Sequence, residues 1–242
     1  MGKKSNRDFI KEDIKRATMD EQPDPQRDTL PLKGTIVLVD ERNQAGIGEG
    51  VSSKTFSLVA TITDNPSGLR KVYNKYDRGS NYETGEYIEL KEKNADLDER
   101  KKVIWDMIRS GAHFCEVTVD KTADMLPKGF DPKKGMHLYR NTLDALMDEV
   151  MGNLKSEEVS VFFDDHTSLK GNAGVKSAKN AAKKYCKKII CSKQLASANE
   201  PLLQLNDFPT GAVGRMAEDN DNRSFKVMKK YTKSKKIGKR QR

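Results

Sequence analysis

Short apolar runs separated by polar loops mark the first part of the chain. Thr35–Val39 is a β-rich run that stops at Asp40-Glu41, as expected of a central strand buried on both faces. Phe56–Thr63 is a second run, which ends at a turn-forming segment beginning with Asp64, and Glu86–Leu90 is a third. Three successive strands joined by loops predict an antiparallel meander.

The apolar spacing then changes to a helical period that alternates with further strands. The pattern predicts a helix over 98–110, a strand over 114–119, a helix over 138–154, a strand over 159–163, a helix over 175–190 and a last helix over 207–218. Strands that alternate with helices favour parallel pairing. The predicted fold class is therefore α/β, with a mixed five-stranded sheet of an antiparallel meander plus parallel strands, flanked by helices.

Charge and proline divide the chain into three parts. Residues 1–33 contain Pro23, Pro25 and Pro31 and show no lasting periodicity, which predicts a flexible N-terminal arm. The net charge is +9, and residues 224–242 alone hold seven Lys and two Arg without any acid. We therefore expect one domain over 34–220 and a basic, disordered tail over 221–242.

Composition excludes several classes of protein. Hydrophobic residues make up 35% and charged residues 33% of the 242 positions, which is polar but sufficient for a core. No apolar run approaches the roughly 18 residues of a membrane span, and no hydrophobic leader follows Met1. The spacing of Cys115, Cys186 and Cys191 fits neither a disulfide framework nor a zinc site. These features predict a soluble, cytoplasmic protein with no membrane partner, and they leave its oligomeric state open.

Acidic residues stand where predicted strands end. Asp40 follows the first strand, Asp164 the fifth, and Asp207 begins the last helix. The carboxyl ends of parallel strands gather ligands, so Asp40 and Asp164 would lie side by side if their strands are neighbours. Carboxylates without His or Cys suit Mg²⁺ or Mn²⁺. Two such ions can promote cleavage of a phosphodiester.

The order of these motifs carries a resemblance. The segments are Ile36-Val37-Leu38-Val39-Asp40-Glu41, Phe56-Ser57-Leu58-Val59, Ile88-Glu89-Leu90-Lys91, Val161-Phe162-Phe163-Asp164 and Leu203-Gln204-Leu205-Asn206-Asp207-Phe208 with Gly211-Ala212-Val213. Over roughly residues 34–219 they resemble the RNase H-like family filed as domain of unknown function 3800. The resemblance implies an RNase H-like hydrolase fold that acts as a metal-dependent nuclease or in other nucleic-acid processing.

The resemblance also implies a set of site residues. The catalytic acids and metal ligands would be Asp40, Glu89, Asp164 and Asp207. Supporting or alternative residues would be Glu41, Lys91, Asp120, Asp165 and Gln204. Lys91 would contact phosphate, and Glu41 would point to the opposite face of its strand from Asp40. Strand order alone makes Asp120 a competing third acid and Glu99 a rival of Glu89, whereas the resemblance ranks Asp164 above Asp120.

Lysine clusters favour a nucleic-acid partner. The candidates are Lys176, Lys179, Lys183 and Lys187 on one predicted helix, and Lys229, Lys230, Lys233, Lys235 and Lys236 in the tail, where Phe225 and Tyr231 are interleaved. The predicted function is phosphodiester hydrolysis on RNA or DNA by a two-metal carboxylate site. The alternative is a non-catalytic nucleic-acid-binding protein, RNA- or ribosome-associated, that uses the fold as a docking platform.

Overall fold

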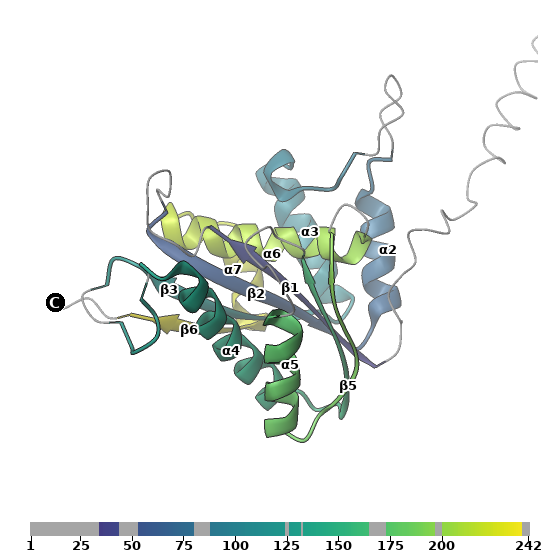
Figure 1. Cartoon of the computed structure of the whole chain (residues 1–242). Helices are drawn as coiled ribbons and strands as arrows, with labels where there is room; N and C mark the ends of the chain where they lie inside the picture. The colour runs from purple at the N-terminus through teal and green to yellow at the C-terminus, as the bar shows by residue number, and fades with distance from the viewer. Residues whose placement is uncertain are drawn as a thin grey trace, which may run out of the picture. The chain divides into compact units, whose positions relative to one another are not determined.

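The structure is a computed structural model, and it describes residues 34–43, 53–79, 88–123, 126–131, 133–164, 173–196 and 200–238 (Figure 1). The strands are β1 (Thr35–Arg42), β2 (Thr55–Thr63), β3 (His113–Asp120), β4 (Glu158–Asp164), β5 (Lys188–Leu195) and β6 (Thr232–Ile237). The helices are α2 (Pro66–Tyr76), α3 (Leu97–Arg109), α4 (Gly135–Asn153), α5 (Ala173–Lys184), α6 (Pro201–Glu218) and α7 (Phe225–Met228), with 3₁₀ turns η1 (Glu92–Asn94) and η3 (Lys229–Tyr231). The predicted N-terminal arm lies outside the described residues.

These strands form one mixed sheet in the order β5-β4-β1-β2-β3-β6. β2 is antiparallel to both β1 and β3, whereas the β1–β4, β4–β5 and β3–β6 pairs are parallel. The predicted fold class, an α/β mixed sheet with an antiparallel meander plus parallel strands, is confirmed. The sheet has six strands rather than five.

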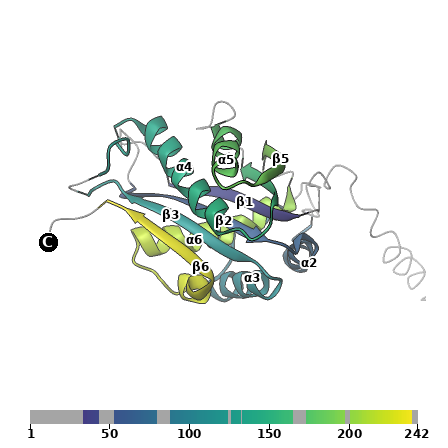
Figure 2. The ribbon, with the colours of Figure 1, turned by 90° about the horizontal axis from the view of Figure 1, so that it is seen from below.

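Helices cover both faces of the sheet (Figure 2). α4 and α5 lie on one face, where alternate residues of the strands, such as Val37 and Val39 of β1, join them in the main apolar core. α6 lies on the other face with α2, α3 and α7 packed against it. Because it is enclosed by the sheet and these helices, α6 is buried along most of its length. None of the described helices has the length and apolar composition of a membrane span.

The predicted third strand, Glu86–Leu90, differs from the structure. Residues 88–90 are not a strand, 86 and 87 lie outside the described residues, and β3 completes the meander instead. Helix α2 occupies part of the interval that the sequence assigned to loops. The turn signal at Asn65-Pro66 is a helix start, because Asn65 Oδ1 accepts a hydrogen bond from Gly68 N at 3.0 Å and Pro66 opens the helix.

The predicted helix over 175–190 is wrong beyond Lys184. α5 ends there, and Cys186 adopts a positive φ of 53°, which reverses the chain before strand β5 begins at Lys188. β5 pairs with β4 at the sheet edge. Lys187 is therefore not on a helix face; its Nζ donates to the carbonyl of Leu154 at 2.8 Å.

The predicted disordered tail also differs from the structure over residues 221–238. This segment forms α7, η3 and β6, and Phe225, Met228 and Ile237 are buried. The high lysine content concealed these three apolar anchors, which hold the segment against the rest of the fold. Residues 239–242 lie outside the described part.

Candidate active site

Two acids stand at the same level on neighbouring parallel strands. The register pairs Val39 of β1 with Phe163 of β4, and Asp40 and Asp164 are the next residues of the two strands. Val39 belongs to the core under α4, so Asp40 points to the opposite face, toward α6. Because β1 and β4 are neighbours, Asp40 and Asp164 lie side by side, as the sequence predicts under that condition.

Helix α6 brings a third acid to this place. Asn206 is fully buried, and its Nδ2 donates to the carbonyls of Leu38 at 3.2 Å and Val59 at 3.4 Å. Its Oδ1 accepts a 2.5 Å hydrogen bond from Thr61 Oγ1. The Asn206 amide thereby fixes α6 to β1 and β2 just before Asp40. Asp207, the next residue of α6, is held beside the strand ends.

An extended segment before η1 lies along α6. Gln204 Oε1 accepts from Leu90 N and Asp207 Oδ2 accepts from Glu92 N, both at 2.8 Å. These two acceptors are three residues apart on one side of α6, and they hold alternate amides of the segment. Glu89 and Lys91 of this segment form an ion pair with each other at 3.0 Å.

Burial and the neighbouring acids both disfavour the charged form of Asp40. Burial, followed by the charges of Asp164 and Asp207, raises the pKa of Asp40 well above its usual range, although the Glu41 amide donates to Asp40 Oδ1 at 2.6 Å. Three anionic groups thus act on one another at the carboxyl ends of β1 and β4. Ionised Asp40 is costly unless a cation is present.

Lys91 supplies a positive charge to the same place. Burial acts to lower the pKa of Lys91, but the Glu89 hydrogen bond and the charges of Glu89, Asp207 and Asp164 outweigh it and raise that pKa. The ammonium therefore stays protonated beside the acids. Such a group is suited to contact a phosphate oxygen.

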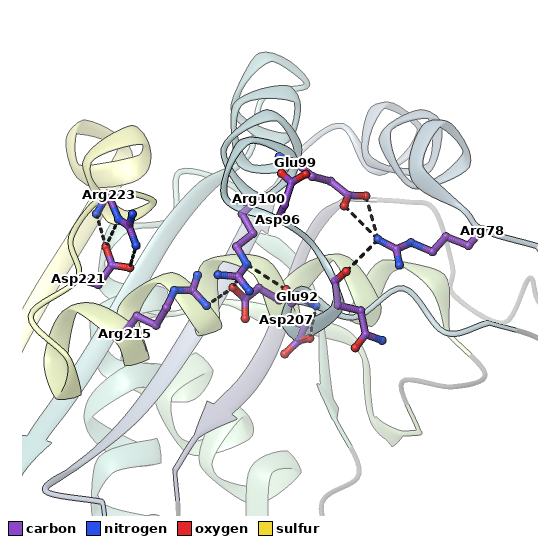
Figure 3. A network of polar contacts seen from close by, with 10 residues as sticks. Arg78, Glu92, Asp96, Glu99, Arg100, Asp207, Arg215, Asp221 and Arg223 are labelled. Atoms are coloured by element: carbon purple, nitrogen blue, oxygen red, sulfur yellow. Dashed lines mark hydrogen bonds and ion pairs between the residues drawn. The ribbon is translucent and has the colours of Figure 1, made fainter.

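A buried ion-pair network centred on Glu92 lies next to Asp207 (Figure 3). The Glu92 side chain is 1% exposed and pairs with Arg100 of α3 at 2.8 Å and with Arg215 of α6. Because the amide of Glu92 donates to Asp207, the network fixes the donor that orients this carboxylate. A Cβ at Gly211 would lie 2.6 Å from the Glu92 carboxyl carbon, so only glycine leaves room for Glu92 against α6.

Other predicted residues lie away from this group. Glu41 contacts the Tyr139 hydroxyl of α4, and burial together with the charges of Glu41, Asp40 and Asp164 raises the pKa of Tyr139. Asp120 ends β3, two strands from β1, where its Oδ1 caps the turn at Thr122. Asp165 lies outside the described residues. Glu99 pairs with Arg78 at 3.0 Å on the surface.

The predicted phosphate-binding lysines divide into two groups. Lys176, Lys179 and Lys183 are exposed along α5, as are Lys229, Lys230, Lys233, Lys235 and Lys236 around η3 and β6. Two of the β6 lysines also bind α4, since Lys235 pairs with Glu149 at 3.0 Å and Lys233 donates to Asn153. The lysines around β6 thus combine a structural contact with a basic surface.

The oxygen ligands that these acids offer suit a hard divalent cation. They are carboxylates, and their repulsion at Asp40 would become attraction around a shared ion. Within the described part of the chain, no three His, Cys, Asp or Glu side chains are already gathered as a metal-binding group. Binding of an ion therefore calls for these side chains to turn toward it.

Comparisons with known proteins identify no family for this chain. No family model matches the chain, so the resemblance to domain of unknown function 3800 is not supported by a family match. No curated protein matches it either. A chain of the PCNA:RNase HII complex from Archaeoglobus fulgidus is similar with a TM-score of 0.46 and 10% identity, over 81% of this chain and 88% of that chain. A likeness at this level carries no argument about chemistry.

Sequence reasoning missed the residues that hold the acids in place. Asn206 binds carbonyls of β1 and β2, and Glu92 and Arg215 come from distant parts of the chain that only the fold brings together, with Arg100 as a nearer partner of Glu92. The one available signal was a polar residue, Asn206, inside an otherwise apolar helical stretch.

Proposed function

We propose that this protein is a divalent-metal-dependent phosphodiester hydrolase that acts on nucleic acid. The observation that carries the proposal is that Asp40 and Asp164 follow paired residues of two neighbouring parallel strands, and that burial, followed by the charges of Asp164 and Asp207, raises the pKa of Asp40. Acids with a purely structural role normally lie apart from one another or pair with cationic side chains. Carboxylates with a perturbed pKa at strand ends are typical of catalytic sites.

The roles of the residues follow from their placement. Asp40, Asp164 and Asp207 would hold Mg²⁺ or Mn²⁺, and the bound ions would lower the pKa of a water and stabilise the leaving oxygen. Glu89 holds the ammonium of Lys91 toward the acids, and Lys91 would contact a nonbridging phosphate oxygen. Hydrolysis adds the oxygen of water to phosphorus, breaks one P–O ester bond and leaves a proton on the departing oxygen.

The test is a cleavage assay on single-stranded and duplex RNA and DNA, with Mg²⁺, Mn²⁺ or chelator. Loss of a second-shell residue costs metal sites about 10- to 100-fold, so Asp40→Asn and Asp164→Asn should lower single-turnover cleavage by at least about 100-fold. The matched control is Asp120→Asn, which removes a strand-end acid two strands from Asp40 and should have a mild effect. Undiminished cleavage by folded Asp40→Asn would remove this site from contention.

Two observations favour the non-catalytic alternative. Lys91 already neutralises Glu89, and the acids are not gathered as a metal-binding group in the described residues. A protein that only binds RNA or DNA would show salt-dependent affinity and no cleavage with either metal. Binding that is unaffected by Asp40→Asn, together with the absence of cleavage, would select this alternative.

A further inference from the structure

A cavity of about 330 Å³ lies at the opposite end of β3 from Asp120. It is open to the surface and is lined by the first residues of β3, the end of α4, and the η3–β6 junction. Ile62 and Cys115, which line it, belong to the core under α4, whereas Asp40 points to the α6 face. The cavity is therefore separate from the cluster of acids.

The lining combines apolar and cationic side chains. Ile62, Val150 and Leu154 are its buried apolar residues. Lys230 and Lys233 are exposed, and Tyr231 is among the large apolar side chains left exposed, at 42%. The acid that reaches the cavity, Glu149, is already paired with Lys235. An anionic ligand with a flat apolar part matches this surface.

The charge of the surrounding segment narrows the class of ligand. Residues 224–238 contain six lysines and no acid, and the lysines continue beyond the cavity along β6. A single small anion would use one or two of these charges. A polyanion with phosphates at regular intervals could contact several of the lysines in residues 224–238 at once.

We infer that this cavity receives one unpaired base of a single-stranded nucleic acid, stacked on Tyr231, while Lys230 and Lys233 contact the adjoining phosphates. The inference rests on the proposed function only for the class of ligand. It adds a binding site remote from the acids and a preference for single strands, since a base that is paired and stacked within a duplex is not free to enter the cavity. Stacking on an exposed tyrosine ring tolerates any base.

The experiment measures the affinity of the full chain for a fluorescently labelled single-stranded oligonucleotide by anisotropy, in chelator so that no cleavage occurs. Tyr231→Leu should weaken binding by about tenfold, because base stacking contributes roughly 1–3 kcal/mol per base. Tyr231→Phe keeps the ring and should bind like the wild type. The matched control is Trp105→Leu, which removes another exposed aromatic, 41% exposed on α3, and should leave affinity unchanged.

A second measurement uses only the wild-type protein, so that folding of a variant does not enter. An abasic oligonucleotide should bind about tenfold more weakly than the normal one, and a duplex of equal length should bind more weakly than the single strand. Equal affinity for normal and abasic strands, or for duplex and single strand, would overturn the inference.

The two proposals fail in different ways. Single-strand binding that depends on Tyr231, without cleavage in any metal, would keep this inference and reject the hydrolase. Cleavage that depends on Asp40, with binding indifferent to Tyr231→Leu and to loss of the base, would keep the hydrolase and overturn the inference.

Discussion

At the scale of single residues, Asp40 shows a conflict between charge and stability. Its carboxylate is partly buried and near the charges of Asp164 and Asp207, and this environment favours the protonated form. Between its ordinary pKa near 3.8 and the raised value, folded Asp40 keeps a proton that the unfolded chain has released. Stability contributed by this residue therefore falls as pH rises through that window.

Asp40→Asn should consequently make the protein more stable at neutral pH while removing metal-dependent cleavage. The asparagine keeps the shape of the side chain and removes the repelled charge. Thermal unfolding of both proteins across pH should show the variant's advantage at pH 7 and none below about pH 4. A variant less stable than the wild type at pH 7 would contradict the electrostatic account.

Glu92→Gln should be strongly destabilising, because it leaves two arginines without the charge that they share. Removing one partner of a buried ion pair costs roughly 3–5 kcal/mol, and the Arg100 and Arg215 side chains are only 20% and 12% exposed. Glu99→Gln is the control, since its pair with Arg78 lies at the surface, where such pairs contribute about 1 kcal/mol or less. Urea denaturation that gave equal losses would show that the Glu92 network is solvated.

At the scale of elements, the sequence predicted the central strands and the helices with clear apolar periods. β2, β3 and β4 are apolar runs with an acid at or just after their last residue, and the apolar part of β1 stops at Asp40, although the strand continues to Arg42, so the local pattern identified all four strands. The adjacency of Asp40 and Asp164 followed from the strand-end rule. The edge strands β5 and β6 were missed because they are lysine-rich, and pairing with β4 and β3 decides their conformation.

The ordered tail leads to a prediction that separates charge from packing. Deleting residues 224–242 removes Phe225, Met228 and Ile237 from the fold as well as the whole net charge. Each buried apolar side chain contributes about 1.5–3 kcal/mol, so the truncated protein should lose several kcal/mol of stability or fail to fold. Circular dichroism and thermal unfolding test this; a truncated protein as stable as the full chain would contradict it.

Lys229→Gln should instead leave the fold intact and reduce the salt dependence of nucleic-acid binding. One fewer neutralised phosphate lowers the slope of log affinity against log salt by about 0.7 for single strands. Lys71→Gln, at an exposed lysine of α2, is the matched control and should leave the slope unchanged. Equal slopes for wild type and Lys229→Gln would show that Lys229 contacts no phosphate.

At the scale of the whole molecule, charge is divided between two places of opposite sign. Residues 1–223 sum to zero and the last 19 residues hold all of the +9, while Asp40, Asp164 and Asp207 concentrate negative charge at the ends of β1 and β4. A polyanion is attracted by the basic residues 224–242 and repelled by the acids at the ends of β1 and β4. Divalent cations at the acids would remove this repulsion, so substrate binding and metal binding should assist each other.

Metal binding should therefore appear in the stability of the protein before any substrate is added. An ion at about 100 times its Kd stabilises the folded state by about 2.7 kcal/mol, which corresponds to several degrees in Tm for a domain of this size. Because the ion displaces the proton of Asp40, the rise in Tm with Mg²⁺ or Mn²⁺ should grow as pH increases through the raised pKa of Asp40. Asp40→Asn should show a smaller shift, and sodium at equal ionic strength is the control. Equal shifts for wild type and Asp40→Asn at every pH would place the ions away from these acids.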